Sequence, residues 1–467
     1  MYELTIDLDM NSKVPLYEQI YSYIKNEIKN GRIECKTKLP STRALAEHLQ
    51  ISRSTVDMAY TQLVSEGYVE SVPYSGYYVC EISLLYNISS MDEKKQVQKS
   101  AKNKAGLIDF SPWGIDLDSF PFNAWRKITK NLLSSDNKEL FASGNSTGEP
   151  ELRNTLSAYL YEARGVRCNP DRIIIGAGME YLLMLLNQLF HEKPVIAMEN
   201  PTYMQAYNVF KKNGNKVLPI DMDKSGMKVM ELNESNADIA YVMPSHQFPM
   251  GIVMPIKRRI ELLEWTNAAD KRYIIEDDYD SEFRYLGKPI PALQGVGNSQ
   301  KVIYMGTFSK SIAPSIRLGY MVLPENLYKN FKEEIGFYSQ TVSKMDQLIV
   351  SEFISKGYFE RHLNKMRSNY KSKHDLMVSL LKEWKDKVSI SGENSGLHIL
   401  ININNSMSEK KLISKAKNEG VKVHGISEYF IKNQNYYKGT ILLGFANLNE
   451  DEIREGIKKL EKAWRLV

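Results

Sequence analysis

The sequence is poor in cysteine and contains no long hydrophobic run. Its three cysteines, Cys35, Cys80 and Cys168, are far apart and odd in number, which argues against a disulfide framework and against paired zinc ligands. The longest apolar run, YLLMLLNQLF, contains Asn187 and Gln188 and is about ten residues long, whereas a membrane-spanning helix needs about twenty. We therefore expect no metal site, no membrane span and a reducing, cytoplasmic environment.

A strong charge of one sign is also absent. The net charge is +5 over 467 residues, so the global charge does not indicate a nucleic-acid binder. The N-terminus, MYELTIDLDM, has no apolar segment of the kind found in a signal peptide. What the chain does have is 43% hydrophobic and 25% charged residues, a composition typical of globular proteins with a sizeable core. Its length favours two or three domains.

Residues 1–81 combine helical periodicity with a hairpin pattern. Apolar residues recur at helical spacing in PLYEQIYSYIKNEIKN, and Gly31 follows as a stop signal. The stretch GYVESVPYSGYYV predicts two short strands about a turn between Tyr74 and Gly76. With the two further helices described next, this region is predicted to be a winged helix-turn-helix domain of the α+β class.

Two helix starts are predicted inside LPSTRALAEHLQISRSTVDMAY. Serine and threonine side chains cap the first turn of helices, so Ser41 or Thr42 is the expected cap of the second helix. Ser52 or Ser54 is the expected cap of the third, which runs to about Ser65.

The remainder of the chain divides into two regions that differ in composition and periodicity. Residues 82–106 are polar, rich in lysine in their second half and aperiodic, and are predicted to be a flexible linker. From 107 to 467, apolar runs such as PVIAMENP and RYIIEDDYD alternate with helical stretches, which predicts an α/β domain with a covered, mainly parallel sheet. We expect a large subdomain at about 107–340 and a small one at about 341–467.

The segment YMGTFSKSIAPSIRLGY, residues 304–320, has an unusual combination of groups. A predicted strand delivers Thr307, Ser309 and Lys310 to a sheet end, and Arg317 follows. A lysine there can form a Schiff base with an aldehyde, while hydroxyls and a guanidinium suit a phosphate. An aldehyde and a phosphate on one molecule describe pyridoxal 5′-phosphate.

Other predicted strand ends supply the remaining groups for this cofactor. Asp277 could pair with the pyridinium nitrogen, and Tyr279 could bond the phenolate oxygen. Tyr203 could stack on the ring. IIIGAGME predicts an anion cradle of backbone N–H groups at a helix start, formed by Ala177, Gly178 and Met179. Each feature alone has an ordinary structural explanation, but their joint occurrence at successive strand ends favours the cofactor.

These motifs carry a family resemblance. STGEPELRNTLSAYL, IIIGAGMEYLL, PSHQFPMG, IIEDDYDSEF and GTFSKSIAPSIRLGY resemble fold-type-I aminotransferases, and the helix-turn-helix stretch at 11–80 resembles a GntR-type DNA-binding domain. The combination resembles the MocR/GabR subfamily of bacterial transcriptional regulators, closest in appearance to its GABA-responsive branch. The resemblance implies Lys310 as the Schiff-base residue and the roles just given for the other residues. It also implies a head-to-tail, domain-swapped homodimer.

DNA contacts are expected from a local charge bias. Residues 1–80 hold eight Lys or Arg against ten Asp or Glu, but the stretch from Arg32 to Val56 holds five basic residues against two acidic ones. A recognition helix presents its first residues to base edges, and arginine is the commonest guanine reader. The expected contacts to a double-stranded operator are Lys38, Thr42, Arg43, Ser52, Arg53, Ser54 and Thr55.

Three functions remain open at this point. A regulator would use cofactor and effector to change how the chain holds DNA, whereas a working aminotransferase would carry the DNA-binding domain as an accessory. A DNA-binding protein with an inactive, cofactor-free domain is the third reading, and the retained lysine, aspartate and phosphate ligands argue against it. Slow turnover or half-transamination, target genes and the sign of regulation do not follow from the sequence.

The effector site is where the sequence departs from the GABA-responsive branch. As we align it, the two arginines that grip the effector's carboxylate there are replaced by Gln205 and Glu428. A carboxylate facing Glu428 would meet a like charge. We therefore expect a small amine or amino compound with a second amine, such as a diamine or a basic amino acid. Alternatively, pyridoxal phosphate itself is the signal.

Overall fold

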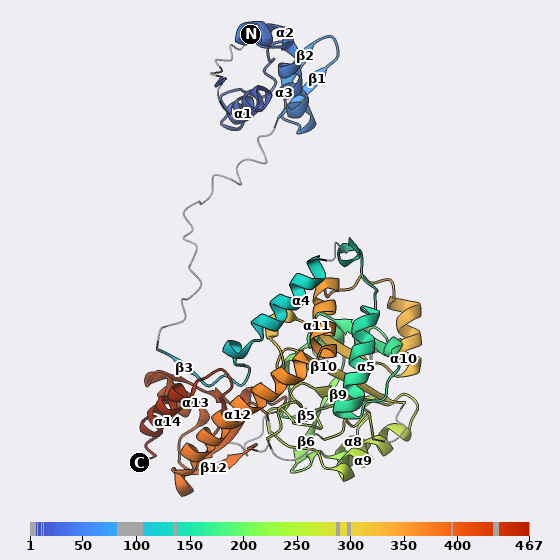
Figure 1. Cartoon of the computed structure of the whole chain (residues 1–467), viewed down its shortest axis with the longest axis vertical. Helices are drawn as coiled ribbons and strands as arrows, with labels where there is room; N and C mark the ends of the chain where they lie inside the picture. The colour runs from blue at the N-terminus through green and yellow to red at the C-terminus, as the bar shows by residue number, and fades with distance from the viewer. Residues whose placement is uncertain are drawn as a thin grey trace. The chain divides into compact units, whose positions relative to one another are not determined.

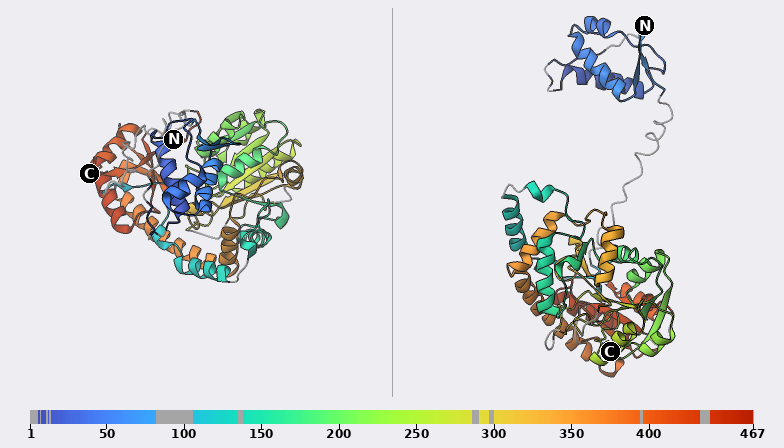
Figure 2. Two further views of the ribbon diagram at one scale, coloured as in Figure 1. Left: turned by 90° about the horizontal axis from the view of Figure 1, so that it is seen from above. Right: turned by 90° about the vertical axis from the view of Figure 1, so that its right-hand side faces the viewer.

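The computed structural model describes residues 14–81, 106–134, 138–285, 290–296, 300–393, 396–432 and 439–466, with residues 6, 8–10 and 12 near the N-terminus. The predicted linker therefore lies outside the described residues except for Gly106. Contacts divide the chain into two compact units, Met1–Lys104 and Ala105–Val467. Figure 1 and Figure 2 show both units.

The N-terminal unit is the winged helix-turn-helix that the sequence predicts. It comprises helices α1 (Leu16–Lys29), α2 (Thr42–Leu49) and α3 (Arg53–Ser65), followed by the antiparallel hairpin β1 (Val69–Val72) and β2 (Gly76–Val79). Side chains of Ile20, Ile24, Val56, Tyr60 and Leu63 are fully buried and join the helices into one core.

The structure shows which of the candidate residues caps each helix. The Ser41 hydroxyl accepts the Ala44 N–H at 3.1 Å and so caps α2, while Thr42 is the first helical residue. The Ser52 hydroxyl accepts the Thr55 N–H at 3.3 Å and caps α3. Each cap satisfies a first-turn donor that has no partner within its helix.

The C-terminal unit is built on an eight-stranded sheet, of which Figure 1 labels β5, β6, β9 and β10. Five neighbouring strands are parallel, whereas β11 is antiparallel to both β10 and β4, and β7 is antiparallel to β6. In spatial order the strands are β4 (Ile173–Gly176), β11 (Gly319–Val322), β10 (Val302–Thr307), β9 (Tyr273–Asp278), β8 (Ile239–Val242), β5 (Ile196–Asn200), β6 (Val217–Asp223) and β7 (Gly226–Met227).

Helices cover both faces of this sheet because its strands alternate buried side chains between two cores. One face packs Ile196 and Ile275 with helix residues such as Leu182 and Phe210. The other face is covered by two separate clusters. The helices are α4 (Phe122–Ser134), α5 (Pro150–Arg164), α6 (Met179–Asn187), α7 (Met204–Lys212), α8 (Val229–Glu234), α9 (Ile256–Asn267), α10 (Glu325–Asn330), α11 (Lys344–Ser355) and α12 (Tyr358–Lys382).

A smaller antiparallel sheet completes the unit. Its strand order is β12 (Val388–Ser391), β13 (His398–Ile403), β16 (Thr440–Gly444) and β15 (His424–Gly425), accompanied by α13 (Glu409–Asn418) and α14 (Glu450–Trp464). Strand β3 (Ile108–Asp109) pairs with β14 (Val421–Lys422), so the start of the unit lies against its C-terminal part. The expected division near residue 340 stays a prediction. Among the described residues no helix is long and apolar enough to cross a bilayer.

Candidate cofactor site and nucleic-acid interface

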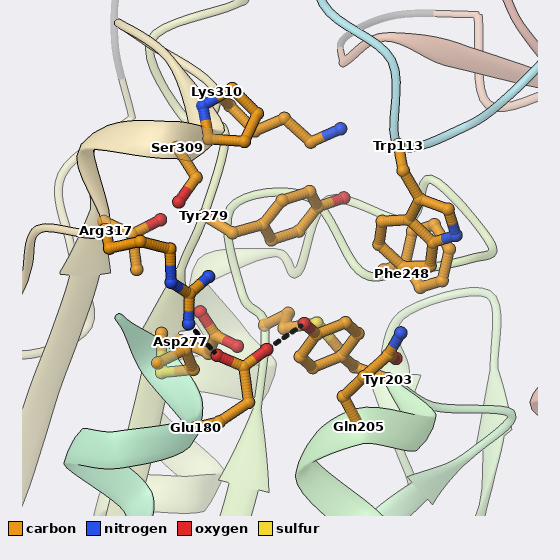
Figure 3. A pocket seen from close by; sticks show the side chains of 14 residues that line it. Trp113, Glu180, Tyr203, Gln205, Phe248, Asp277, Tyr279, Ser309, Lys310 and Arg317 are labelled. Atoms are coloured by element: carbon orange, nitrogen blue, oxygen red, sulfur yellow. Dashed lines mark hydrogen bonds and ion pairs between the residues drawn. The ribbon is translucent and has the colours of Figure 1, made fainter. Parts of the chain in front are cut away.

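A cavity of about 280 Å³ lies where β4, β5, β8, β9 and β10 end (Figure 3). These strands run in one direction, so the residues that follow them meet at one edge of the sheet. Side chains predicted as cofactor or effector ligands come from the ends of β5, β9 and β10, from the starts of α6 and α7, and from the residues before β11. The cavity is lined by Trp113, Met179, Glu180, Tyr203, Gln205, Met243, Phe248, Asp277, Tyr279, Thr307, Ser309, Lys310, Pro314 and Arg317.

Lys310 follows β10 and is 9% exposed. Its Nζ donates a hydrogen bond to the Pro112 carbonyl at 3.0 Å and lies 5.6 Å from the Trp113 ring centroid. Burial lowers the pKa of Lys310 to about 8, because an ammonium group loses hydration there. More of this lysine is therefore the neutral, nucleophilic amine at neutral pH than an exposed lysine would be.

Asp277, on β9, is buried on the floor of the cavity. Its Oδ2 accepts a hydrogen bond from the Tyr241 hydroxyl, while its Oδ1 has no partner among the described residues. Burial raises the pKa of Asp277 to about 7, although the Tyr241 hydrogen bond acts in the opposite direction. A buried carboxylate oxygen without a donor fits the protonated ring nitrogen of pyridoxal phosphate.

Tyr279 projects into the cavity between Lys310 and Phe248 (Figure 3). Its hydroxyl lies 2.9 Å from His246 Nδ1, and the same nitrogen lies 2.8 Å from Asp280 Oδ2. The phenol is thus held by a buried polar group from the segment after β8. This position is consistent with the predicted bond to the cofactor's phenolate oxygen.

The predicted phosphate ligands gather at the start of α6. The Arg317 Nη2 donates to the Ala177 carbonyl at 3.2 Å and forms an ion pair with Glu180 Oε2 at 3.0 Å. A Cβ atom on Gly178 would lie 2.7 Å from that Nη2, so glycine lets the guanidinium lie against the helix start. Thr307 and Ser309 also line the cavity.

Several lining residues were not singled out from the sequence. Trp113 packs 4.5 Å from Phe248 and 5.6 Å from Tyr203, measured between ring centroids, and these rings form one wall. Trp113 belongs to no motif, so no sequence signal could have found it. Glu180 directly follows the predicted anion cradle, and its negative charge at that position is the sequence signal that points to it. The Tyr203 side chain lines the cavity. Its stacking on the cofactor ring stays a prediction.

Of the two predicted effector residues, one lines the described cavity and the other does not. Gln205, at the start of α7, lines the cavity. Glu428 is not among the lining residues; its Oε1 lies 3.9 Å from His424 Nδ1, and its side chain is 58% exposed. The hydrogen bond with His424 lowers the pKa of Glu428. In the described chain, Glu428 is therefore outside the cavity wall, and its effector role stays a prediction.

The predicted DNA-reading residues lie at the exposed start of α3. The Ser52 hydroxyl lies 2.9 Å from the Ser54 hydroxyl and 2.7 Å from that of Thr55. The Arg53 side chain is 67% exposed and lies 3.6 Å from Asp57 in an ion pair. This arrangement leaves the Arg53 guanidinium accessible while its neighbours fix the helix start.

The other expected DNA contacts differ in exposure. Arg43 is exposed and pairs with Glu47 at 3.1 Å, while the Lys38 ammonium lies 5.7 Å from the Tyr78 ring of the hairpin. Thr42 is only 6% exposed, and its hydroxyl accepts a 3.4 Å hydrogen bond from Arg53. Thr42 is therefore positioned to orient the Arg53 side chain, and its contact with DNA stays a prediction.

Comparison with known proteins agrees with both units. The description "Bacterial regulatory proteins, gntR family" matches residues 16–79, and "Aminotransferase class I and II" matches residues 115–460. The chain is 43% identical to the HTH-type transcriptional regulator YdeL of Bacillus subtilis, over 99% of this chain and 100% of that protein. It is 32% identical to the probable rhizopine catabolism regulatory protein MocR of Rhizobium meliloti, over 98% and 95% respectively.

The C-terminal unit also has solved structural neighbours. A multiple substrate aminotransferase from Thermococcus profundus superposes with a TM-score of 0.69 at 25% identity, covering 81% of this chain and 98% of that one. Membership of the aminotransferase class I and II family implies pyridoxal phosphate as the cofactor, in agreement with the buried lysine and the unpaired Asp277 oxygen. The chain thus belongs to the MocR type of GntR-family transcriptional regulators, with a DNA-binding helix-turn-helix unit joined to an aminotransferase class I and II unit.

Proposed function

We propose that this chain is a pyridoxal-phosphate-dependent regulator whose operator binding changes when a small amine or amino compound binds at the cofactor site. The observation that carries the proposal is the course of the chain just after the N-terminal unit. Only a few residues beyond the boundary, Pro112 accepts the Lys310 hydrogen bond and Trp113 lines the cavity. Chemistry at Lys310 therefore acts directly on the segment that leads back to the DNA-binding unit.

This segment is held on both sides of its contact with the site. Before the contact, the Phe110 N–H donates to the Lys422 carbonyl at 3.0 Å, next to the β3–β14 pairing. After the contact, Lys373 pairs with Asp116 at 3.1 Å. Because both flanks are fixed, the Pro112 contact is the point at which a change at Lys310 reaches this segment.

The residues divide the work around the cofactor. When bound, pyridoxal phosphate supplies an aldehyde for an amine and a ring that accepts electron density. Lys310 provides the partly deprotonated amine, and Asp277 holds a proton at the ring nitrogen. Thr307, Ser309 and Arg317 bind the phosphate. Trp113 and its aromatic neighbours exclude water from one side of the cavity.

The test is a DNase footprint on the DNA upstream of the chain's own gene. Protein with and without pyridoxal phosphate is compared, and candidate amines are then added to the loaded protein. We expect protection or affinity to change with the cofactor and again with an amine. The proposed head-to-tail dimer predicts two separated repeats in the footprint. A footprint insensitive to cofactor and amines would contradict the proposed regulation, and one short protected site would contradict the dimer.

Effector choice needs a separate titration, because Gln205 is the only one of the two expected effector residues on the described cavity wall. GABA, a diamine and a neutral amino acid are added to the loaded protein and to Glu428→Arg, and the visible absorbance is followed. We expect weak GABA binding by the wild type, because Gln205 offers its carboxylate no positive charge. Stronger carboxylate binding by the variant would support an effector role of Glu428. Tight GABA binding by the wild-type protein would rule out the amine-selective effector.

A working aminotransferase is the second candidate, favoured by the low pKa of Lys310 and the unpaired Asp277 oxygen. It would bind an amino acid and a keto acid in turn and release both products. Sustained amino-group transfer between two such substrates, measured by product formation over many turnovers, would support it. A single stoichiometric conversion would instead support a regulator that retains half of the reaction.

A further inference from the structure

We propose that Glu180 competes with the cofactor's phosphate for Arg317 and so sets the concentration at which the chain takes up pyridoxal phosphate. The inference rests on the cofactor site of the proposed function and adds a residue that opposes binding. A regulator that holds its cofactor less tightly can respond to the supply of that cofactor. Glu180 would thus be a specificity-determining residue for the phosphate group.

The contact is defined by two hydrogen-bonding partners on the carboxylate. Glu180 Oε2 lies 3.0 Å from Arg317 Nη2, and Oε1 lies 3.4 Å from the Tyr203 hydroxyl (Figure 3). The same nitrogen, Arg317 Nη2, also donates a hydrogen bond to the Ala177 carbonyl at 3.2 Å. The carboxylate therefore occupies a donor of the same guanidinium that the cofactor's phosphate needs.

Arg317 presents its guanidinium at the start of α6. Its backbone is left-handed, with φ of 49°, and its guanidinium lies against Gly178 with no room for a Cβ atom. The Glu180 carboxylate and a phosphate would also share the positive end of α6, since Glu180 is in its first turn and the cap residue Gly178 has no capping side chain. Binding of the phosphate must therefore displace Glu180 or bear its repulsion.

The expected change in cofactor affinity depends on how exposed the two side chains are to water. The Glu180 and Arg317 side chains are 37% and 54% exposed, so water screens their ion pair, and exposed pairs of this kind contribute little. A phosphate dianion beside the carboxylate is repelled more strongly than a monoanion. We therefore expect removal of the charge to improve cofactor affinity by about three- to tenfold.

The experiment compares wild-type protein with Glu180→Gln, which keeps the length of the side chain and removes its charge. Binding of pyridoxal phosphate, pyridoxal and inorganic phosphate is measured by quenching of protein fluorescence and by equilibrium dialysis. We expect Glu180→Gln to bind pyridoxal phosphate and inorganic phosphate more tightly, with pyridoxal affinity unchanged because it lacks the phosphate. Higher salt should reduce the difference in pyridoxal phosphate affinity between the wild type and Glu180→Gln.

Two matched variants isolate the contact. Glu151→Gln changes an exposed first-turn glutamate of α5 and should leave all three affinities unchanged. In an Arg317→Ala background, Glu180→Gln should lose most of its effect, because the shared guanidinium is gone. Thermal unfolding of each variant verifies that the fold is retained.

An unchanged or lower ratio of pyridoxal phosphate to pyridoxal affinity in Glu180→Gln would overturn the inference, while the proposed function would stand if the wild type still binds the cofactor and DNA. Equal improvement for pyridoxal would also overturn it, since the effect would then not concern the phosphate. A wild-type chain that binds no pyridoxal phosphate would instead overturn the proposed function, and this inference with it.

Discussion

The cofactor site and the surface of the N-terminal unit hold polar residues in opposite surroundings. Asp277 and Lys310 are buried, and their pKa values lie at about 7 and about 8 because burial disfavours the charged forms. In the N-terminal unit, Glu66 has its pKa lowered to about 2 by hydrogen bonds from Lys25 and Tyr21 at the surface. Burial governs the first region, and local pairing governs the second.

The difference teaches where large mutational effects should occur. A buried group without a partner carries a large desolvation cost, which a ligand can remove by supplying that partner. An exposed group already has water, so its contacts with DNA or with other side chains contribute less and depend on salt. The expected effects below decrease from the buried region to the exposed one.

The largest effect is expected for Lys310→Ala. Loss of the amine should abolish the visible absorbance that wild-type protein acquires with pyridoxal phosphate, as should borohydride treatment followed by dialysis into fresh cofactor. Absorbance spectra of the two proteins measure this. Lys224→Ala, at an exposed turn position, is the control and should retain the spectrum. A retained spectrum in Lys310→Ala would contradict the assignment of Lys310 as the Schiff-base residue.

Asp277→Asn should change stability and cofactor affinity in opposite directions. The folded-state pKa of about 7 is above the unfolded value, so the folded protein binds more protons, and the free energy of unfolding falls as pH rises from about 4 to about 7. At pH 8 without cofactor, the variant should therefore be more stable than wild type, by on the order of 2–4 kcal/mol. At pH 4 the difference should vanish.

The same substitution should weaken cofactor binding by roughly ten- to a hundredfold, because the charged partner of the ring nitrogen is lost. Thermal unfolding across pH and a cofactor titration measure the two effects. Asp118→Asn, at an exposed position, should change neither. If the free energy of unfolding depended on pH in the same way for the variant and the wild type, burial would not raise the pKa of Asp277.

Arg53→Ala should have an intermediate effect on DNA. If Arg53 reads a guanine edge, its loss should cost about 1–3 kcal/mol of binding free energy and relax base preference at one position. Lys38→Ala should weaken binding evenly across sequences. Mobility-shift titrations on operator variants compare the two. Unchanged affinity and preference in Arg53→Ala would place the reading surface elsewhere.

The smallest effect is expected at Glu66. Its folded pKa is below the unfolded value, so its contribution to stability is present at neutral pH and is lost as pH falls toward about 2. Glu66→Gln should slightly speed amide exchange in α1 and α3 at pH 7, and the difference from wild type should shrink in acid. Hydrogen-exchange mass spectrometry measures it. A large destabilisation would contradict the surface character of the contact.

The sequence by itself determined the three N-terminal helices, the hairpin, several buried strands and the order of the cofactor motifs. Capping serines and 3.6-residue periodicity are local properties, so α1, α2 and α3 follow from the nearby residues alone. The strand ends carrying Asp277 and Lys310 were also predictable, because buried parallel strands are short apolar runs followed by polar residues. Their common edge follows from the parallel arrangement of such sheets.

Only the tertiary structure decided which distant residues complete the site. Trp113 reaches the cavity because β3 pairs with β14, more than three hundred positions later in the chain, and no local pattern encodes that pairing. The Arg317–Glu180 ion pair and the place of Glu428 outside the described cavity wall likewise depend on side-chain directions. Such contacts are decided by the packing of whole elements, because proximity in space between distant residues leaves no periodicity in the sequence.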